Sequence, residues 1–315
     1  GLGDYNELGE PVGKGRGAFT VVYLPTVLTV PTSTLDFTWN LTWKMKRKDR
    51  GRGPFSWILS NVSLNQSFRV REETTARDAY KVYLLFPSAL QRDESTLAGI
   101  VSLRQEWSLL DAYPNWSLAI KYQRDDEEEN RFENVNEERL FEQHLVRLDH
   151  SLTSRLSANV ELRREIKQRG GRGLATGTGS TYDVLGLAAA AGWGLRFTAG
   201  STLDGEIEYR EQEDSESGAR EVAITFRPRF VWRLTKSLSL FGRYEVTRFE
   251  LSEESGIKPF YFANPGTTQR WALTPNLRLS KVISLLGTYQ GRSEETFSGS
   301  RIVDHELTVE TRAYF

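Results

Sequence analysis

The chain has 315 residues, with 41 lysines and arginines against 42 aspartates and glutamates, and it contains no cysteine. The absence of cysteine excludes a disulfide scaffold, a thiolate metal site and a cysteine nucleophile. The balanced charge argues against nucleic acid as a partner. No run of about 18 apolar residues is present, so the sequence predicts no transmembrane helix.

The first 33 residues do not have the pattern of the rest of the chain. Residues 1–17 are rich in glycine and polar side chains, and residues 18–31 are apolar on both faces and interrupted by Pro25. Proline removes a donor from a strand ladder and favours an edge or a bend. We therefore expect residues 1–33 to form a lead-in or plug segment outside the regular strands.

From residue 34 onward, apolar and polar side chains alternate with a period of two. This pattern is typical of β-strands that have one apolar and one polar face. It is clearest in residues 222–234 and 238–246, which are separated by a short turn. The segment 80–86 is apolar on both faces, and we also interpret it as a strand. The predicted strands, about fourteen, are centred near residues 40, 66, 83, 103, 120, 144, 160, 189, 206, 227, 245, 274, 289 and 308.

The last stretch, residues 302–315, alternates strictly and ends on Phe315. It resembles the closing strand of bacterial outer-membrane β-barrels, in which the terminal aromatic residue is part of the signal read by the assembly machinery. The resemblance implies an all-β fold, a transmembrane antiparallel up-and-down β-barrel, located in the bacterial outer membrane. It also implies Phe315 as an assembly signal.

Three features favour a membrane barrel over a soluble β-sandwich. The expected turns after residues 110, 150, 197, 234 and 280 are tight, whereas the connections after residues 124, 166, 211, 252 and 294 are longer and polar. Most predicted strands are long enough to cross a bilayer at a tilt. Tryptophan prefers the membrane interface, and the expected interface aromatics are Trp107, Trp116, Trp193, Trp232 and Trp271.

Fourteen is an even number, so both ends of the barrel are expected on the periplasmic side. The predicted domains are a glycine-rich periplasmic segment, residues 1–33, and a transmembrane barrel, residues 34–315. Three alternatives stay open. The barrel has 12 strands if residues 55–96 form one loop, or 16 strands, or the chain is the C-terminal part of a larger barrel.

The polar faces of the late strands are expected to line the lumen. Interleaved charges of opposite sign on adjacent strands favour a ladder of salt bridges; an arginine constriction that selects anions is the sharper alternative. The expected lumen-lining residues are Arg227, Arg229, Arg233, Arg243, Arg270, Arg278, Arg312, Glu206, Glu208, Glu245, Glu306 and Glu310.

Residues for catalysis or metal binding are few. His144 and His150 share a strand face but lie about 20 Å apart, too far for one metal ion. The acidic stretch 124–138 has no EF-hand spacing and is expected to be a solvated loop. We therefore predict no cofactor, no metal and no enzymatic activity.

The predicted function is a porin-like channel for small polar solutes. The alternatives are an outer-membrane anchor or translocation subunit of a larger assembly, and an outer-membrane hydrolase. Expected partners are outer-membrane lipid, lipopolysaccharide and the barrel assembly machinery. A periplasmic or surface subunit is a further candidate partner.

Overall fold

The computed structural model describes residues 32–44, 62–75, 79–85, 90–91, 95–110, 115–132, 135–171, 181–252, 265–280, 282–295 and 299–313. The chain divides into two compact units, Gly1–Thr32 and Ser33–Phe315. The predicted lead-in therefore lies almost entirely outside the described residues, as does the predicted assembly signal Phe315.

The second unit is almost entirely β-structure. Its only described helix, α2 (Ala79–Tyr83), is not long and apolar enough to cross a membrane. The strands are β1 (Ser33–Lys44), β2 (Val62–Thr74), β3 (Thr96–Leu109), β4 (Trp116–Phe132), β5 (Val135–Ser151), β6 (Leu156–Gly170), β7 (Tyr182–Thr198), β8 (Ser201–Asp214), β9 (Arg220–Phe226), β10 (Arg229–Arg233), β11 (Leu238–Ser252), β12 (Gly266–Arg278), β13 (Ile283–Glu295) and β14 (Arg301–Ala313).

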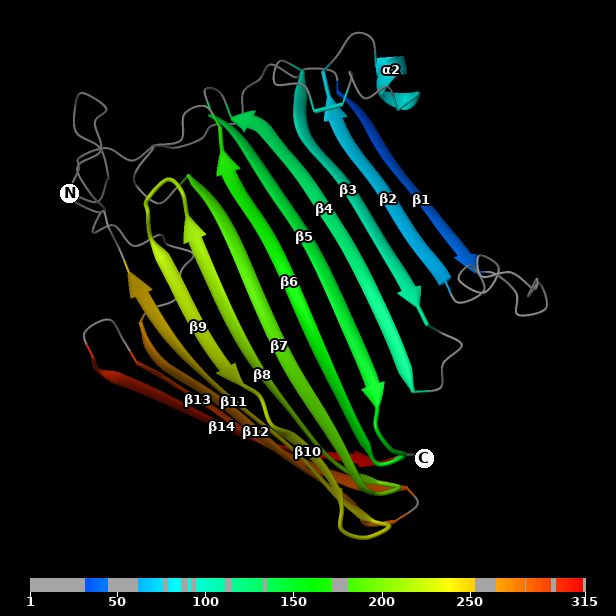
Figure 1. Cartoon of the computed structure of the whole chain (residues 1–315), viewed down its shortest axis with the longest axis vertical. Coiled ribbons are helices and arrows are strands. Elements are labelled where there is room, and N and C mark those ends of the chain that lie inside the picture. Colours follow the sequence, from blue (N-terminus) through cyan, green and yellow to red (C-terminus); the bar gives the residue numbers. More distant parts are fainter. Residues whose placement is uncertain are drawn as a thin grey trace. The chain divides into compact units, whose positions relative to one another are not determined.

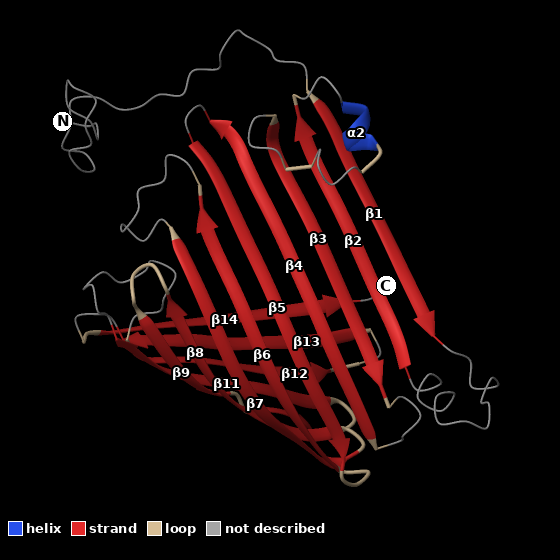
Figure 2. Ribbon diagram, turned by 45° about the horizontal axis from the view of Figure 1, so that its top comes forward, coloured by secondary structure: helices blue, strands red, loops and turns tan. Residues whose placement is uncertain are grey.

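All fourteen strands belong to one sheet, in which each strand pairs antiparallel with its neighbour in the sequence (Figure 1). The one departure from this order is at β9 and β10, which both lie between β8 and β11. They are two halves of one crossing, divided at Arg227 and Pro228. Figure 2 shows that the sheet curls, so that β11–β14 run across the direction of β1–β6.

The expected number of strands is confirmed, but two of its members differ from the prediction. The segment 80–86, predicted as a strand, contains α2 instead. A short segment that is apolar on both faces has no period that separates strand from helix, which explains the error. The strand predicted near residue 227 is divided into β9 and β10, because Pro228 has no N–H to donate to the ladder.

The predicted acidic loop is also wrong. β4 continues to Phe132 and β5 begins at Val135, so most of the stretch 124–138 is strand. Its carboxylates have partners that hold them in the sheet. Asp125 accepts a hydrogen bond from Ser102 of β3, and Glu127 lies 3.9 Å from the guanidinium of Arg139. Charged residues with cross-strand partners are compatible with strand structure.

Since β9 and β10 together run once from rim to rim, the described strands run thirteen times between the two rims of the sheet. β1 and β14 therefore run in the same direction. Ser33 and Ala313 therefore lie at opposite rims, whereas the sequence predicted one rim for both ends of the barrel. The tight turns 152–155, 199–200, 234–237 and 279–282 share the rim of Ala313, which we call the short-turn rim. The residues between the strands that depart from the predicted contrast, 45–61 at this rim and 133–134 at the opposite rim, lie outside the described residues.

Candidate functional site

The two faces of the sheet differ in chemistry because the alternation in the sequence is kept in register from strand to strand. One face, which we call the apolar face, exposes large aliphatic side chains. Val160, Leu162, Ile207 and Ile224 are each more than half exposed on it. The other face, which we call the charged face, carries most of the arginines and carboxylates of β5–β14. Exposed aliphatic side chains on long strands suit contact with lipid.

Aromatic side chains form two rows on the apolar face. Trp107, Trp116, Trp193 and Trp232 lie near the short-turn rim and are partly exposed. Trp271 does not share that row. It lies further from that rim, directly opposite Tyr244 and Gly291 in the register, and Tyr209 and Tyr289 likewise lie further from the short turns than the first four tryptophans. Two aromatic rows with aliphatic residues between them match the girdles at the two interfaces of a bilayer.

Glycine makes room for these aromatics. A Cβ atom on Gly205 would lie 2.7 Å from the indole of Trp193, and one on Gly291 would lie 2.6 Å from that of Trp271. Each indole therefore lies across bare backbone of the neighbouring strand. Contact with the glycine backbone of the adjacent strand holds the orientation of each indole ring.

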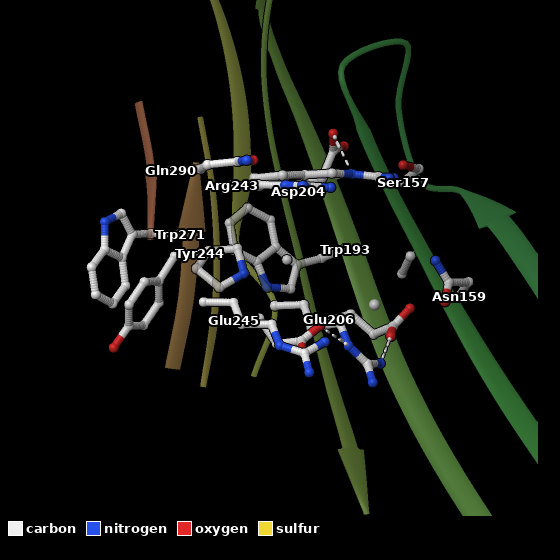
Figure 3. Close-up of a pocket in the computed structure, with 18 of the residues that line it drawn as sticks. Ser157, Asn159, Trp193, Asp204, Glu206, Arg243, Tyr244, Glu245, Trp271 and Gln290 are labelled. Carbon is white, nitrogen blue, oxygen red and sulfur yellow. Dashed lines mark hydrogen bonds and ion pairs between the residues drawn. The ribbon is translucent and has the colours of Figure 1, made fainter. Parts of the chain in front are cut away.

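The charged face is hollowed into a cavity of about 1080 Å³, built by strands β5–β8 and β10–β14 (Figure 3). Arginines and carboxylates line it in equal number, six of each. The arginines are Arg147, Arg227, Arg229, Arg243, Arg270 and Arg292, and the carboxylates are Asp149, Asp204, Glu206, Glu245, Asp304 and Glu306.

Arg227 is the centre of an ion-pair network on this face. Its Nη1 lies 2.7 Å from Glu206 and 3.0 Å from Glu208, and its Nε lies 3.1 Å from Glu245. The residue occupies the break between β9 and β10, where its backbone N–H still donates to the carbonyl of Glu206. The side chain thus joins β8 to β11 where Pro228 weakens the backbone ladder.

The network crosses β7 within the stretch from Gly186 to Gly194, where that strand carries only glycine and alanine on the charged face. Arg163 of β6 reaches Glu208 of β8 at 3.3 Å, although β7 lies between the two strands. Ala190, at the crossing point, is opposite Glu161 and Glu208 in the register and is 9% exposed. A longer side chain at this position would separate the two charges.

On the other side the network continues to β5. The guanidinium of Arg163 lies 3.9 Å from Glu161, which is also 3.9 Å from Arg147, and Arg147 pairs with Asp149 at 2.9 Å. The pairs therefore form a continuous path from β5 to β11. Adjacent charges of opposite sign stabilise one another on a sheet face, and this attraction offsets the desolvation cost of each.

The predicted lumen residues all lie on the charged face, but they do not form one cluster. Seven of them line the cavity, and Glu208 belongs to the network beside it. The other four lie toward the short-turn rim, where Arg278 donates to the carbonyl of Ser280 and the side chain of Arg233 packs against Gly200. Arg312 pairs with Glu310 along β14, at 2.8 Å.

The part of the network on β5 and β6 was not predicted, because the predicted lumen residues belong only to the late strands. Arg147, Asp149, Glu161 and Arg163 follow the same alternation as the residues that were predicted. Extending the charged face to residues 139–167 would have found them. The pairing of Arg163 with Glu208 across β7 has no comparable signal in the sequence.

The three histidines lie among aromatic side chains on the apolar face. His150 stacks on Trp116 with ring centroids 3.7 Å apart, and His305 stacks on Tyr289 at 5.9 Å. His144 is 2.8 Å from Glu142. Among the described residues, no group of three histidine or acidic side chains is arranged to hold a metal ion.

An antiparallel up-and-down sheet with these two faces has the architecture of bacterial outer-membrane β-barrels. No protein-family model matches the sequence, and no curated protein matches it. Among solved structures, the open form of the ferric-catecholate import receptor Fiu from E. coli K12 is similar with a TM-score of 0.50 and 9% identity, over 88% of this chain and 61% of the receptor. Its closed form is similar with the same score and identity, over 83% of this chain and 50% of the receptor.

A third structure, the ferric preacinetobactin receptor BauA from Acinetobacter baumannii, has a TM-score of 0.49 and 12% identity, over 89% of this chain and 50% of the receptor. The chain thus spans between half and about three fifths of these structures. The similarity to the open form of Fiu confirms the predicted fold class, an all-β antiparallel up-and-down β-barrel.

Proposed function

We propose that this chain forms the wall of an outer-membrane barrel whose charged face lines an aqueous path for small polar solutes. The observation that carries the proposal is the cavity of about 1080 Å³, lined by equal numbers of arginines and carboxylates, on the face opposite the lipid-compatible one. Charged groups on an inner face require water or partners of opposite sign. A wet, charge-balanced lumen admits polar solutes with little preference for either sign of charge.

Conductance in planar lipid bilayers tests this proposal. Purified protein whose folding has been verified by heat-modifiable electrophoretic mobility is inserted, and current is recorded under a KCl gradient. We expect discrete conductance steps and a reversal potential near zero, because the lining charges balance. Folded, inserted protein without conductance steps would overturn the proposal.

A second candidate, a translocation or anchoring subunit of a larger assembly, is favoured by the two edges of the sheet. Among the described strands, β1 and β14 each pair with only one neighbour. An open edge in a bilayer leaves backbone groups unsatisfied, so both edges need partners. Since β1 and β14 run in the same direction, an antiparallel seam needs at least one intervening strand.

Native mass spectrometry of the protein extracted from its membrane separates this candidate from the channel. A stable complex with a second polypeptide, together with a silent bilayer recording, would favour the assembly role. Monomeric protein that conducts would favour the channel. We also propose that the chain is not an enzyme, which a lipid and peptide turnover assay on the same preparation tests.

The proposed partners of the apolar face are outer-membrane lipid and lipopolysaccharide, with the barrel assembly machinery acting on the unfolded chain. The two aromatic rows and the aliphatic side chains between them support a lipid contact. Brominated lipids should quench the tryptophan fluorescence of the inserted protein. The absence of quenching would contradict the assignment of this face.

A further inference from the structure

Four arginines on adjacent strands form a stripe across one part of the cavity. Arg229 of β10 is directly opposite Arg243 of β11, and Arg270 of β12 is directly opposite Arg292 of β13. Like charges in directly opposed positions destabilise a sheet. This arrangement differs from the alternating charges of the network around Arg227. Because the repulsion between opposed arginines destabilises the sheet, their role is not to stabilise it.

Only the two outer arginines of the stripe have carboxylate partners. Arg229 lies 3.4 Å from Asp204, and Arg292 lies 2.7 Å from Asp304. Among the described residues, the inner pair, Arg243 and Arg270, make no hydrogen bond or ion pair. Both side chains are exposed to the cavity.

The nearest carboxylate does not neutralise the inner pair. Glu245 is opposite Arg270 in the register, but its side chain is engaged by Arg227 at 3.1 Å. On the far side, Gln290 donates to Glu306 at 2.7 Å. Among the described residues, the inner arginines therefore have no carboxylate within ion-pair distance, although the charges of the cavity balance as a whole.

The floor between the two guanidinium groups is small and apolar. Ala272 is directly opposite Arg243 and Gln290 in the register, and it is buried. Arg243 and Arg270 are diagonal neighbours on one face, whose Cα atoms are about 7–8 Å apart in such a pair. Two forked donors at this spacing, both lining the cavity and separated by a position that carries only an alanine, leave room for a ligand between them.

We propose that Arg243 and Arg270 bind a small solute that carries two oxyanion groups, carboxylate or phosphate, inside the cavity. Guanidinium forks recognise both groups through paired, charge-assisted hydrogen bonds. The site adds to the proposed aqueous path a place where one class of solute binds. It rests on that function for its biological meaning, although binding itself requires only the folded cavity.

Isothermal titration calorimetry of the detergent-solubilised full chain tests the site, with citrate and pyrophosphate as the probes and chloride as the background anion. We expect binding of at least one probe, and a loss of about tenfold or more in affinity in Arg243→Gln/Arg270→Gln, since each hydrogen bond to a charged group is lost. The control Arg220→Gln/Arg248→Gln removes two arginines that lie on the apolar face, toward the rim opposite the short turns, and should bind like the wild type.

A second variant keeps the result interpretable if the glutamines alter folding. Arg243→Lys/Arg270→Lys retains both charges but loses the forked geometry, so its affinity should fall between the wild type and the double glutamine variant. Citrate binding alone assigns carboxylates, and pyrophosphate binding alone assigns phosphates. No binding of either probe to folded wild-type protein, or equal binding by Arg243→Gln/Arg270→Gln, would overturn the site.

The bilayer recording separates this outcome from the proposed function. A site that binds the probes in protein without conductance leaves the inference standing and removes the channel. A conducting protein that binds neither probe leaves the channel and removes the site. If the protein both conducts and binds a probe, the bound probe should reduce the current. This block should be weaker in Arg243→Gln/Arg270→Gln.

Discussion

Replacing Arg227 by methionine should destabilise the barrel more than any other single loss of charge in the network. Methionine keeps the length of the aliphatic stem but removes the guanidinium donors that face Glu206, Glu208 and Glu245. Three carboxylates on neighbouring strands are then left close together. Glu208 keeps only Arg163, at 3.3 Å, as a partner of opposite charge.

The size of the effect follows from the burial of these groups. Removing one member of a fully buried ion pair costs about 3–5 kcal/mol, whereas an exposed pair contributes roughly 0–1 kcal/mol. Arg227 is 37% exposed and Glu208 is 9% exposed, so the case lies between these limits. We expect the free energy of unfolding to fall by roughly 2 kcal/mol.

The measurement is urea unfolding of protein folded in lipid vesicles, followed by tryptophan fluorescence. Arg248→Met is the matched control, because Arg248 is 70% exposed and pairs only with the equally exposed Glu250. That control should change stability by less than about 0.5 kcal/mol. Arg227→Lys should fall between the two, because one ammonium group cannot replace a fork that contacts three carboxylates.

Equal stabilities of Arg227→Met and Arg248→Met would refute this reasoning. The network would then be a set of independent, solvent-screened pairs. Raising the salt concentration provides a check, because screened pairs weaken with ionic strength and desolvated ones respond less.

Two further predictions compare neighbouring positions on opposite faces. Val160→Arg places a charge on the apolar face and should destabilise the inserted barrel by about 2–4 kcal/mol, whereas Asn159→Arg on the charged face should have a small effect in the same vesicle unfolding assay. Ala190→Leu should lower stability by separating Arg163 from its partner across β7, whereas Ala189→Leu, on the apolar face, should be tolerated. Similar unfolding transitions for both leucine variants would show that the small residues of β7 on the charged face are not required.

The alternation of side chains was sufficient to predict the fold and its two faces. The strands from β3 to β14 were expected near their observed positions, except that β9 and β10 were predicted as one strand, since a period of two persists wherever one face is apolar and the other is charged. Strand ends were less predictable. The extension of β4 and β5 into the acidic stretch depends on partners such as Ser102 and Arg139, which lie on other strands.

The cavity was predicted only in part for a similar reason. The alternation assigns Arg227, Arg243 and Glu245 to one face, but it does not indicate which charges meet. That depends on register and on intervening side chains. The path from Arg163 to Glu208 exists only because β7 carries alanine and glycine between them, a condition that becomes visible when three strands are aligned.

Register also separates two kinds of charge within one lumen. From β5 to β11, opposite signs meet within ion-pair distance, and the charges stabilise the wall. From β10 to β13, the same alternation brings arginine opposite arginine, and two guanidinium groups are left for a ligand. A balanced total therefore does not imply an inert surface. A solute with two oxyanion groups can take the place of the missing carboxylates. It finds two guanidinium groups without partners only where the strand register places like charges side by side.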